Sequence, residues 1–96
     1  MESVKMLKLV VVGQTKCPPC NVLKNQIAER IEEFQELDVD YLYVNLDGLE
    51  DKDTFIQKHK LKSTPAIWFE INGIKLKEFN GYTDVDTLLE NIGGLK

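Results

Sequence analysis

The sequence has 96 residues, of which 43% are apolar and 29% charged, and its formal net charge is −4. We expect a single globular domain spanning residues 1–96, because this composition is unlike that of disordered chains, and the acidic balance disfavours nucleic-acid binding. No stretch approaches the roughly 20 apolar residues of a membrane span, and Met1 to Met6 does not resemble a signal peptide, so we expect a cytoplasmic protein with no membrane partner.

The first half of the chain predicts a strand, a helix and a second strand. Leu7 to Val12 is β-branched and almost continuously apolar, which is typical of a central strand covered on both faces. Asn21 to Leu37 then predicts one long helix, closed by Asp38, because its apolar residues recur at helical spacing. Asp40 to Leu46 predicts a strand with Leu42, Val44 and Leu46 on one face. A right-handed crossover makes these two strands parallel.

The second half predicts a helix, a hairpin and a final helix. Asp51 can cap a helix that ends near His59, where we expect a partly exposed cation. The Asn72-Gly73 pair indicates a hairpin between Ala66–Ile71 and Ile74–Phe79. Apolar alternation slips between Leu76 and Phe79, so the second strand either ends early or contains a bulge.

The last predicted helix carries its own start and stop signals. Thr83 and Asp86 are spaced as in a capping box, and Gly93-Gly94 is expected to end the helix. The complete predicted order is βαβαββα.

The chemistry of the chain is expected at Cys17-Pro18-Pro19-Cys20, which contains both of its cysteines. A cysteine at a helix start is favoured as thiolate by the positive end of the helix dipole, and only the thiolate attacks disulfides. In a reducing compartment such a pair is more often redox-active or metal-binding than structural. Zinc needs four ligands, whereas the chain offers two cysteines and His59, so a metal site would need a second subunit or an added thiol.

The chain resembles the thioredoxin superfamily from Leu7 to Ile92. The resemblance rests on the order of elements, the Cys-x-x-Cys at a helix start, Thr64-Pro65 before an apolar strand, the segment Val44 to Asp47, and Gly81 after the hairpin. It implies an α/β thioredoxin-like fold with a mixed four-stranded sheet flanked by helices. Because the chain lacks the extra amino-terminal strand and helix of full-length thioredoxins, it is closer to compact glutaredoxin-like members.

The resemblance also implies roles for individual residues. Cys17 would be the attacking thiol and Cys20 the resolving thiol. Pro65 would be the cis-proline facing them, and Pro18, Pro19, Thr64 and Pro65 would contact substrate.

Several positions depart from the family pattern. Lys16 stands where thioredoxins usually carry tryptophan, Val11 where they bury an acid, and Tyr43 where that acid is commonly paired with lysine. The two glycines of Gly93-Gly94 follow the last predicted helix, whereas glutaredoxins carry such a pair before it, which disfavours a glutathione site.

The two prolines of the motif have a specific consequence. Neither can donate an N–H to the Cys17 sulfur, which leaves the Cys20 amide and the Thr15 hydroxyl as candidate donors. A residue before proline avoids the α region, so we expect Pro18 to stay extended and the helix to begin at Pro19 or Cys20. We expect a moderately acidified Cys17.

These observations predict a thiol-disulfide oxidoreductase of the protein-disulfide reductase type, working through Cys17 and Cys20 as a monomer without a bound cofactor. Its expected partners are disulfide-containing proteins and an electron donor, either a flavoprotein reductase or a low-molecular-weight thiol such as glutathione. The alternative is a dimeric module that binds a metal or an iron–sulfur cluster through the same cysteine pair. A purely structural disulfide is disfavoured because so short a loop gains little from closure.

Overall fold

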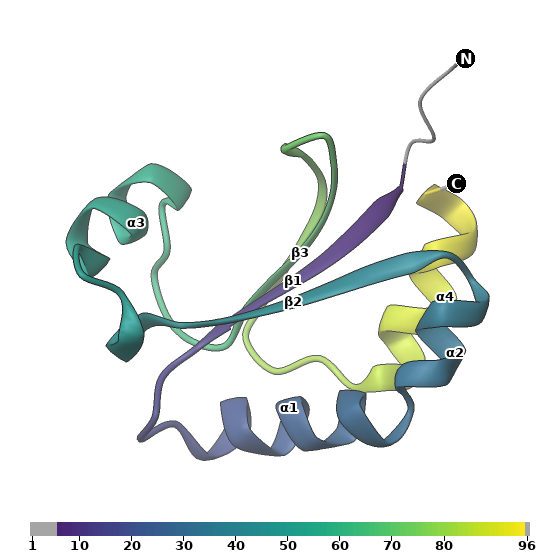
Figure 1. The fold of residues 1–96 in the computed structure, drawn as a ribbon, viewed down its shortest axis with the longest axis horizontal. Coiled ribbons are helices and arrows are strands. Elements are labelled where there is room, and N and C mark those ends of the chain that lie inside the picture. The colour runs from purple at the N-terminus through teal and green to yellow at the C-terminus, as the bar shows by residue number, and fades with distance from the viewer. Residues whose placement is uncertain (1–5, 96) are drawn as a thin grey trace.

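The computed structural model describes residues 6–95, which form a mixed four-stranded sheet flanked by helices (Figure 1). The elements are β1 (Leu7–Gly13), α1 (Pro18–Glu29), α2 (Ile31–Glu36), β2 (Val39–Asn45), a 3-10 helix (Leu46–Gly48), α3 (Lys52–His59), β3 (Ala66–Ile71), β4 (Ile74–Asn80) and α4 (Val85–Leu95). The strand order is β2-β1-β3-β4, with β1 parallel to β2 and antiparallel to β3. The predicted fold class and the parallel β1–β2 pair are confirmed.

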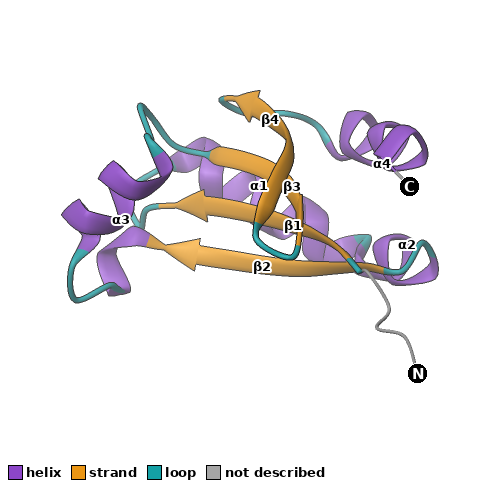
Figure 2. Ribbon diagram, turned by 90° about the horizontal axis from the view of Figure 1, so that it is seen from above, coloured by secondary structure: helices purple, strands orange, loops and turns teal. Residues whose placement is uncertain are grey.

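Strand β1 lies in the middle of the sheet and is buried on both faces, as its sequence predicts. Leu9 and Val11 face the cluster built with α1, α2 and α4, whereas Val10 and Val12 face the cluster that includes α3. Full burial of each such aliphatic side chain contributes about 1.5–3 kcal/mol. Helix α3 lies beyond the carboxyl ends of β1 and β2 (Figure 2). Because β1 is held on both faces and both edges, it fixes the position of the loop that leads from Gly13 to Cys17.

The helix predicted over Asn21 to Leu37 is wrong in one respect, because it is divided at Arg30 into α1 and α2. Arg30 has φ −118° and ψ 23°, and its N–H donates to the Ile27 carbonyl at 3.1 Å instead of to the Gln26 carbonyl, which an α-helix would use. The apolar spacing continues across this break, since Ile27 and Phe34 are both fully buried. Periodicity alone therefore could not reveal it.

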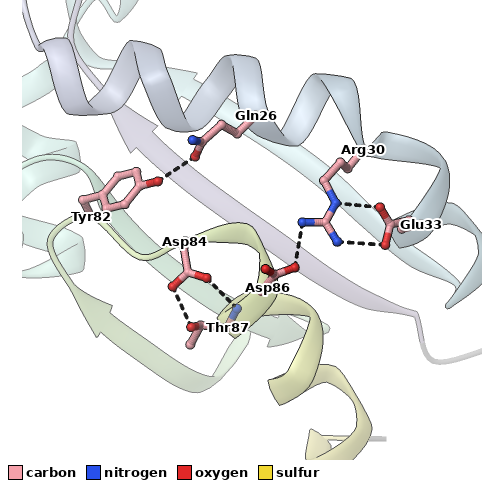
Figure 3. A network of polar contacts seen from close by, with 7 residues as sticks. All are labelled: Gln26, Arg30, Glu33, Tyr82, Asp84, Asp86 and Thr87. Atoms are coloured by element: carbon pink, nitrogen blue, oxygen red, sulfur yellow. Dashed lines mark hydrogen bonds and ion pairs between the residues drawn. The ribbon is translucent and has the colours of Figure 1, made fainter.

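The Arg30 side chain connects this break to α4 (Figure 3). Its guanidinium donates to Glu33 at 2.6 and 3.0 Å and to Asp86 at 2.8 Å. These bonds raise the pKa of Arg30 and lower that of the Glu33 carboxyl. The Tyr82 hydroxyl donates to Gln26 at 2.6 Å nearby, so a polar network holds the first turn of α4 against α1.

The structure corrects both predicted ends of α4. Asp84, not Thr83, caps the helix, because its carboxylate accepts the Thr87 N–H at 3.2 Å. The Thr83 hydroxyl instead donates to the Gly81 carbonyl at 3.3 Å. At the other end, α4 continues through Gly93-Gly94 to Leu95, so the predicted glycine stop is wrong. The Asp51 cap of α3 is confirmed, with a 3.1 Å bond from the Thr54 N–H.

The hairpin turns at Asn72 and Gly73, whose φ angles of 53° and 81° are those of a tight type I′ turn. Phe69 pairs with Lys77 and Glu70 with Lys75, so Leu76 is the extra residue of a bulge in β4. Of the two alternatives left by the sequence, the bulge is the observed one, and β4 continues to Asn80.

His59 is partly exposed, as its position predicts, but its surroundings disfavour the predicted positive charge. Its ring stacks on Trp68 with centroids 4.8 Å apart and contacts Phe55 at 4.5 Å. Desolvation in this position lowers the pKa of His59, as do the nearby charges of Lys75 and Lys58 to a smaller extent, so the neutral ring is favoured. The side chain therefore belongs to the packing of the α3 face.

Candidate active site

Helix α1 begins directly at the cysteine pair. Cys17 is its N-cap, and its sulfur accepts a hydrogen bond from the Cys20 N–H at 3.3 Å. Pro18 and Pro19 occupy the first two helical positions, so Pro18 is helical and not extended as predicted, and the helix begins one or two residues before the predicted start at Pro19 or Cys20. Proline suits these positions because its φ is already helical and its missing N–H would have no partner within the helix. Within this turn, the Cys20 amide is the donor to the sulfur, as expected.

The two cysteines form a disulfide with an S–S distance of 2.00 Å and Cα atoms 5.2 Å apart. They are not equally accessible: Cys17 is 7% exposed, whereas Cys20 is completely buried. Pro18 and Pro19 are exposed beside them. A molecule approaching this surface therefore reaches the Cys17 sulfur first.

The loop before β3 supplies a second donor to that sulfur. The Thr64 hydroxyl lies 3.6 Å from Cys17 Sγ and 3.0 Å from Gln14 Oε1. Because a hydroxyl has one proton, these two acceptors share it. The next peptide bond, Thr64–Pro65, is cis, and Pro65 is buried. The structure thus brings Thr64 and Pro65 to the cysteine pair across 47 residues of sequence.

Thr15, proposed from the sequence as a donor to Cys17, is instead bound to the end of β2. Its N–H donates to Asp47 Oδ2 at 2.7 Å, and its hydroxyl accepts from Asn45 Nδ2 at 3.2 Å. Hydrogen bonds from the Thr15 amide and hydroxyl lower the pKa of Asp47, with smaller contributions from Lys52 and Lys16. Asn21 Nδ2 also donates to the Thr15 carbonyl at 3.2 Å, which fixes the loop before the cysteines.

Beneath the cysteine pair lies a close contact that sequence reasoning missed. A β-carbon placed on Gly13 would overlap the Tyr43 hydroxyl oxygen and would lie 2.9 Å from Cys20 Cβ. Tyr43 and Cys20 therefore share the space over Gly13, where a larger residue would not fit. The neighbouring Val11 is completely buried and apolar. The sequence signal available was the glycine at the end of β1.

A cavity of about 200 Å³ lies beside Pro65, which is one of its lining residues. Its lining includes Ser63, Ala66, Asn80 and Gly81, and neither cysteine contributes to it. It provides a shallow depression along the loop that faces the disulfide.

Two negative findings apply to residues 6–95. Within that range no three or more His, Cys, Asp or Glu side chains are grouped so that they could hold a metal ion. Over the same residues no helix is both long and apolar enough to cross a membrane.

Comparison with known proteins places this architecture in a family. Residues 2–93 match the family described as a thioredoxin-like domain. Among solved structures, thioredoxin-2 of a malaria parasite, described as a component of its protein secretion machinery, is 16% identical with a TM-score of 0.80, over 97% of this chain and 86% of that one. Fasciola hepatica thioredoxin is 22% identical with a TM-score of 0.77, over 95% and 82% of the respective chains.

Chlamydomonas reinhardtii thioredoxin f2 is likewise 22% identical, with a TM-score of 0.76 over 96% of this chain and 81% of that one. At such identities the structural matches show a shared fold, while the match over residues 2–93 establishes the family. The chain belongs to the thioredoxin-like domain family, and with its Cys17–Cys20 pair it is a thiol-disulfide oxidoreductase at the level of that family.

Proposed function

We propose that this protein reduces disulfide bonds of other proteins in the cytoplasm, with Cys17 as the attacking thiol and Cys20 as the resolving thiol. The observation that carries the proposal is the unequal accessibility of the pair, since Cys17 is 7% exposed at a helix N-terminus and Cys20 is completely buried. The accessible sulfur can meet a substrate, while the buried one can meet only its neighbour.

The reaction consists of two exchanges. The Cys17 thiolate attacks one sulfur of a substrate disulfide, the substrate S–S bond breaks, and the expelled substrate sulfur leaves as a thiolate that takes up a proton. Cys20, having lost its proton, then attacks Cys17 Sγ and expels the second substrate sulfur in the same way. The substrate has gained two electrons, and Cys17 and Cys20 are joined as a disulfide. A flavoprotein reductase or a low-molecular-weight thiol then returns two electrons to the pair.

Substrate contact is proposed at the exposed Pro18 and Pro19 on one side of the sulfur and at Thr64 and Pro65 on the other. An extended substrate segment can lie along this loop and pair with its backbone, as in strand addition. The depression beside Pro65 leaves room for a substrate side chain. We propose that the protein acts as a monomer in this cycle.

The acidity of Cys17 contributes to the reduction potential of the pair, which sets the direction of the cycle. Two donors reach its sulfur, the Cys20 amide at 3.3 Å and the Thr64 hydroxyl at 3.6 Å, and the second is shared with Gln14. This supports a moderately acidified thiol and a reducing protein. A titrated Cys17 pKa below about 5, as in strongly oxidising relatives, would contradict this part of the proposal.

The proposal is tested by following insulin reduction with a dithiol as electron donor. We expect the wild type to turn over, Cys17→Ser to be inactive, and reduced Cys20→Ser, mixed with insulin after the dithiol has been removed, to stop after one exchange with substrate attached. Equal rates for the wild type and Cys17→Ser would end the assignment. Bound metal or visible colour in the purified protein would favour the metal-binding alternative instead.

A further inference from the structure

We propose that the Tyr43 hydroxyl is a positioning group for the resolving thiol, donating a hydrogen bond to the Cys20 thiolate during the second exchange. This inference rests on the proposed two-step function and concerns Cys20, the less accessible of the two cysteines.

The geometry around Gly13 places the two groups together. A β-carbon on Gly13 would overlap Tyr43 Oη, and it would lie 3.0 Å from Tyr43 Cζ and 2.9 Å from Cys20 Cβ. The phenol therefore extends from β2 across Gly13 to the inner side of α1, where Cys20 lies. The absence of a side chain at Gly13 creates the space for this approach.

The surroundings of Cys20 make such a donor useful. Cys20 is completely buried, and among residues 6–95 the fully buried set contains no polar or charged side chain other than the cysteines. An apolar environment disfavours a thiolate, yet Cys20 must become one in order to attack Cys17. A nearby hydroxyl can stabilise the anion without adding a charge to the interior.

The charge state of Tyr43 suits this task. Desolvation raises the pKa of Tyr43 above its ordinary value, so the hydroxyl keeps its proton across the working range and acts as a donor, not as a base. Lys24 of α1 lies over its ring, with Nζ 4.9 Å from the centroid, and Tyr41 is the other titratable group on this face of β2. Val11 and Gly13, which face it from β1, do not titrate.

The expected effect follows from the dependence of thiol exchange on acidity. Loss of one hydrogen bond to an anion changes the thiolate population by about tenfold. The thiolate of a less acidic thiol is also a better nucleophile, with a Brønsted coefficient of about 0.5. The rate of the Cys20 step should therefore decrease by only about threefold at neutral pH. Above the thiol pKa, where Cys20 is fully ionised in both proteins, only the nucleophilicity differs, so the decrease should reverse to an increase of about threefold.

The experiment compares Tyr43→Phe with Tyr41→Phe, because Tyr41 lies on the same strand and its buried hydroxyl has no hydrogen-bond partner among residues 6–95. Reduced protein is mixed with excess dithiobis(nitrobenzoate) in a stopped-flow instrument. Attack by Cys17 releases one thionitrobenzoate, and attack by Cys20 on the resulting mixed disulfide releases the second. The rate of the second release is recorded as a function of pH.

We expect Tyr43→Phe to slow the second release about threefold at neutral pH and to speed it about threefold at high pH, while Tyr41→Phe matches the wild type throughout. Equal slowing at every pH would indicate a structural effect, and no slowing at any pH would show that the hydroxyl does not assist Cys20; either result overturns the inference. Because the probe is a small aromatic disulfide, the outcome is independent of whether insulin is reduced.

Discussion

Replacing Gly13 with alanine tests the packing beneath the cysteine pair. Alanine is normally the better residue in regular structure by about 0.5–1 kcal/mol, because glycine loses more backbone entropy on folding. Here the added β-carbon would overlap the Tyr43 hydroxyl and lie 2.9 Å from Cys20 Cβ. We therefore expect Gly13→Ala to destabilise the protein, contrary to the intrinsic preference.

The size of the stability loss in Gly13→Ala depends on how far the groups around the added β-carbon can shift. β1 is bonded to β2 and β3 on its two sides, Tyr43 ends in a rigid ring, and Cys20 Cβ is attached directly to the backbone of α1. Overpacking of this kind reduces the free energy of unfolding by about 1–3 kcal/mol. Tyr43→Phe removes the overlapping oxygen, so the double variant should recover about 1 kcal/mol relative to the sum of the single changes.

Urea unfolding of the oxidised proteins measures this cycle. With a slope of about 1–2 kcal/mol per molar urea, a loss of about 2 kcal/mol lowers the midpoint by about 1–2 M. The control is Gly48→Ala, where a β-carbon would meet nothing within 4 Å and stability should change by less than about 0.5 kcal/mol. A Gly13→Ala protein as stable as the wild type would show that Tyr43 does not fill the space over Gly13.

Three further predictions concern α4, Cys17 and the helix caps. Gly93→Ala should stabilise the protein by about 0.5–1 kcal/mol, seen as a higher urea midpoint, because it lies inside α4 with open space at its β-position; destabilisation would indicate that the helix ends before it. Thr64→Val should slow iodoacetamide alkylation of Cys17 at neutral pH by about two- to tenfold, since it removes a donor to the sulfur, whereas Thr64→Ser should not. Hydrogen bonds from the first turns of α3 and α4 lower the pKa values of Asp51 and Asp84, so their stabilisation is present above the unfolded carboxyl pKa of about 4 and is lost as pH falls through the lower folded values. The urea concentration at the unfolding midpoint should therefore decrease when the pH is lowered below about 4. Asp84→Asn, which keeps the cap acceptor, should weaken this dependence of stability on pH.

Local signals in the sequence were sufficient for most of the fold. The continuous apolar run of β1, the Asn72-Gly73 turn and the Asp51 cap each specify their structure through residues that are close together in the chain. These features therefore appear in the structure as predicted.

The errors lie where distant contacts decide the outcome. Apolar spacing continues across Arg30 although the helix breaks there, and the arginine is bonded to Asp86 in α4. Gly93 and Gly94 remain helical because α4 is anchored through buried Leu88 and Ile92 on its inner face. Neither effect could be read from the local pattern.

The same distinction applies to the site. Cys17, Cys20 and Pro65 were identified by spacing and resemblance, whereas the bond from Thr64 to the Cys17 sulfur requires the loop before β3 to lie against α1. Likewise, the position of Tyr43 beside Cys20 depends on its register opposite Val11 and on the missing side chain of Gly13. The sequence showed an unusual tyrosine but not what it contacts.

The most direct test of the central claim is to locate the sulfur that forms the mixed disulfide. Reduced Cys20→Ser is incubated with oxidised insulin, and the covalent product is mapped by non-reducing peptide mass spectrometry beside Cys17→Ser treated in the same way. We predict a Cys17–insulin disulfide in the first protein and little product in the second, because Cys17 retains 7% exposure whereas Cys20 is completely buried. An insulin adduct at Cys20 of the Cys17→Ser protein, formed as quickly as the one at Cys17, would contradict the account.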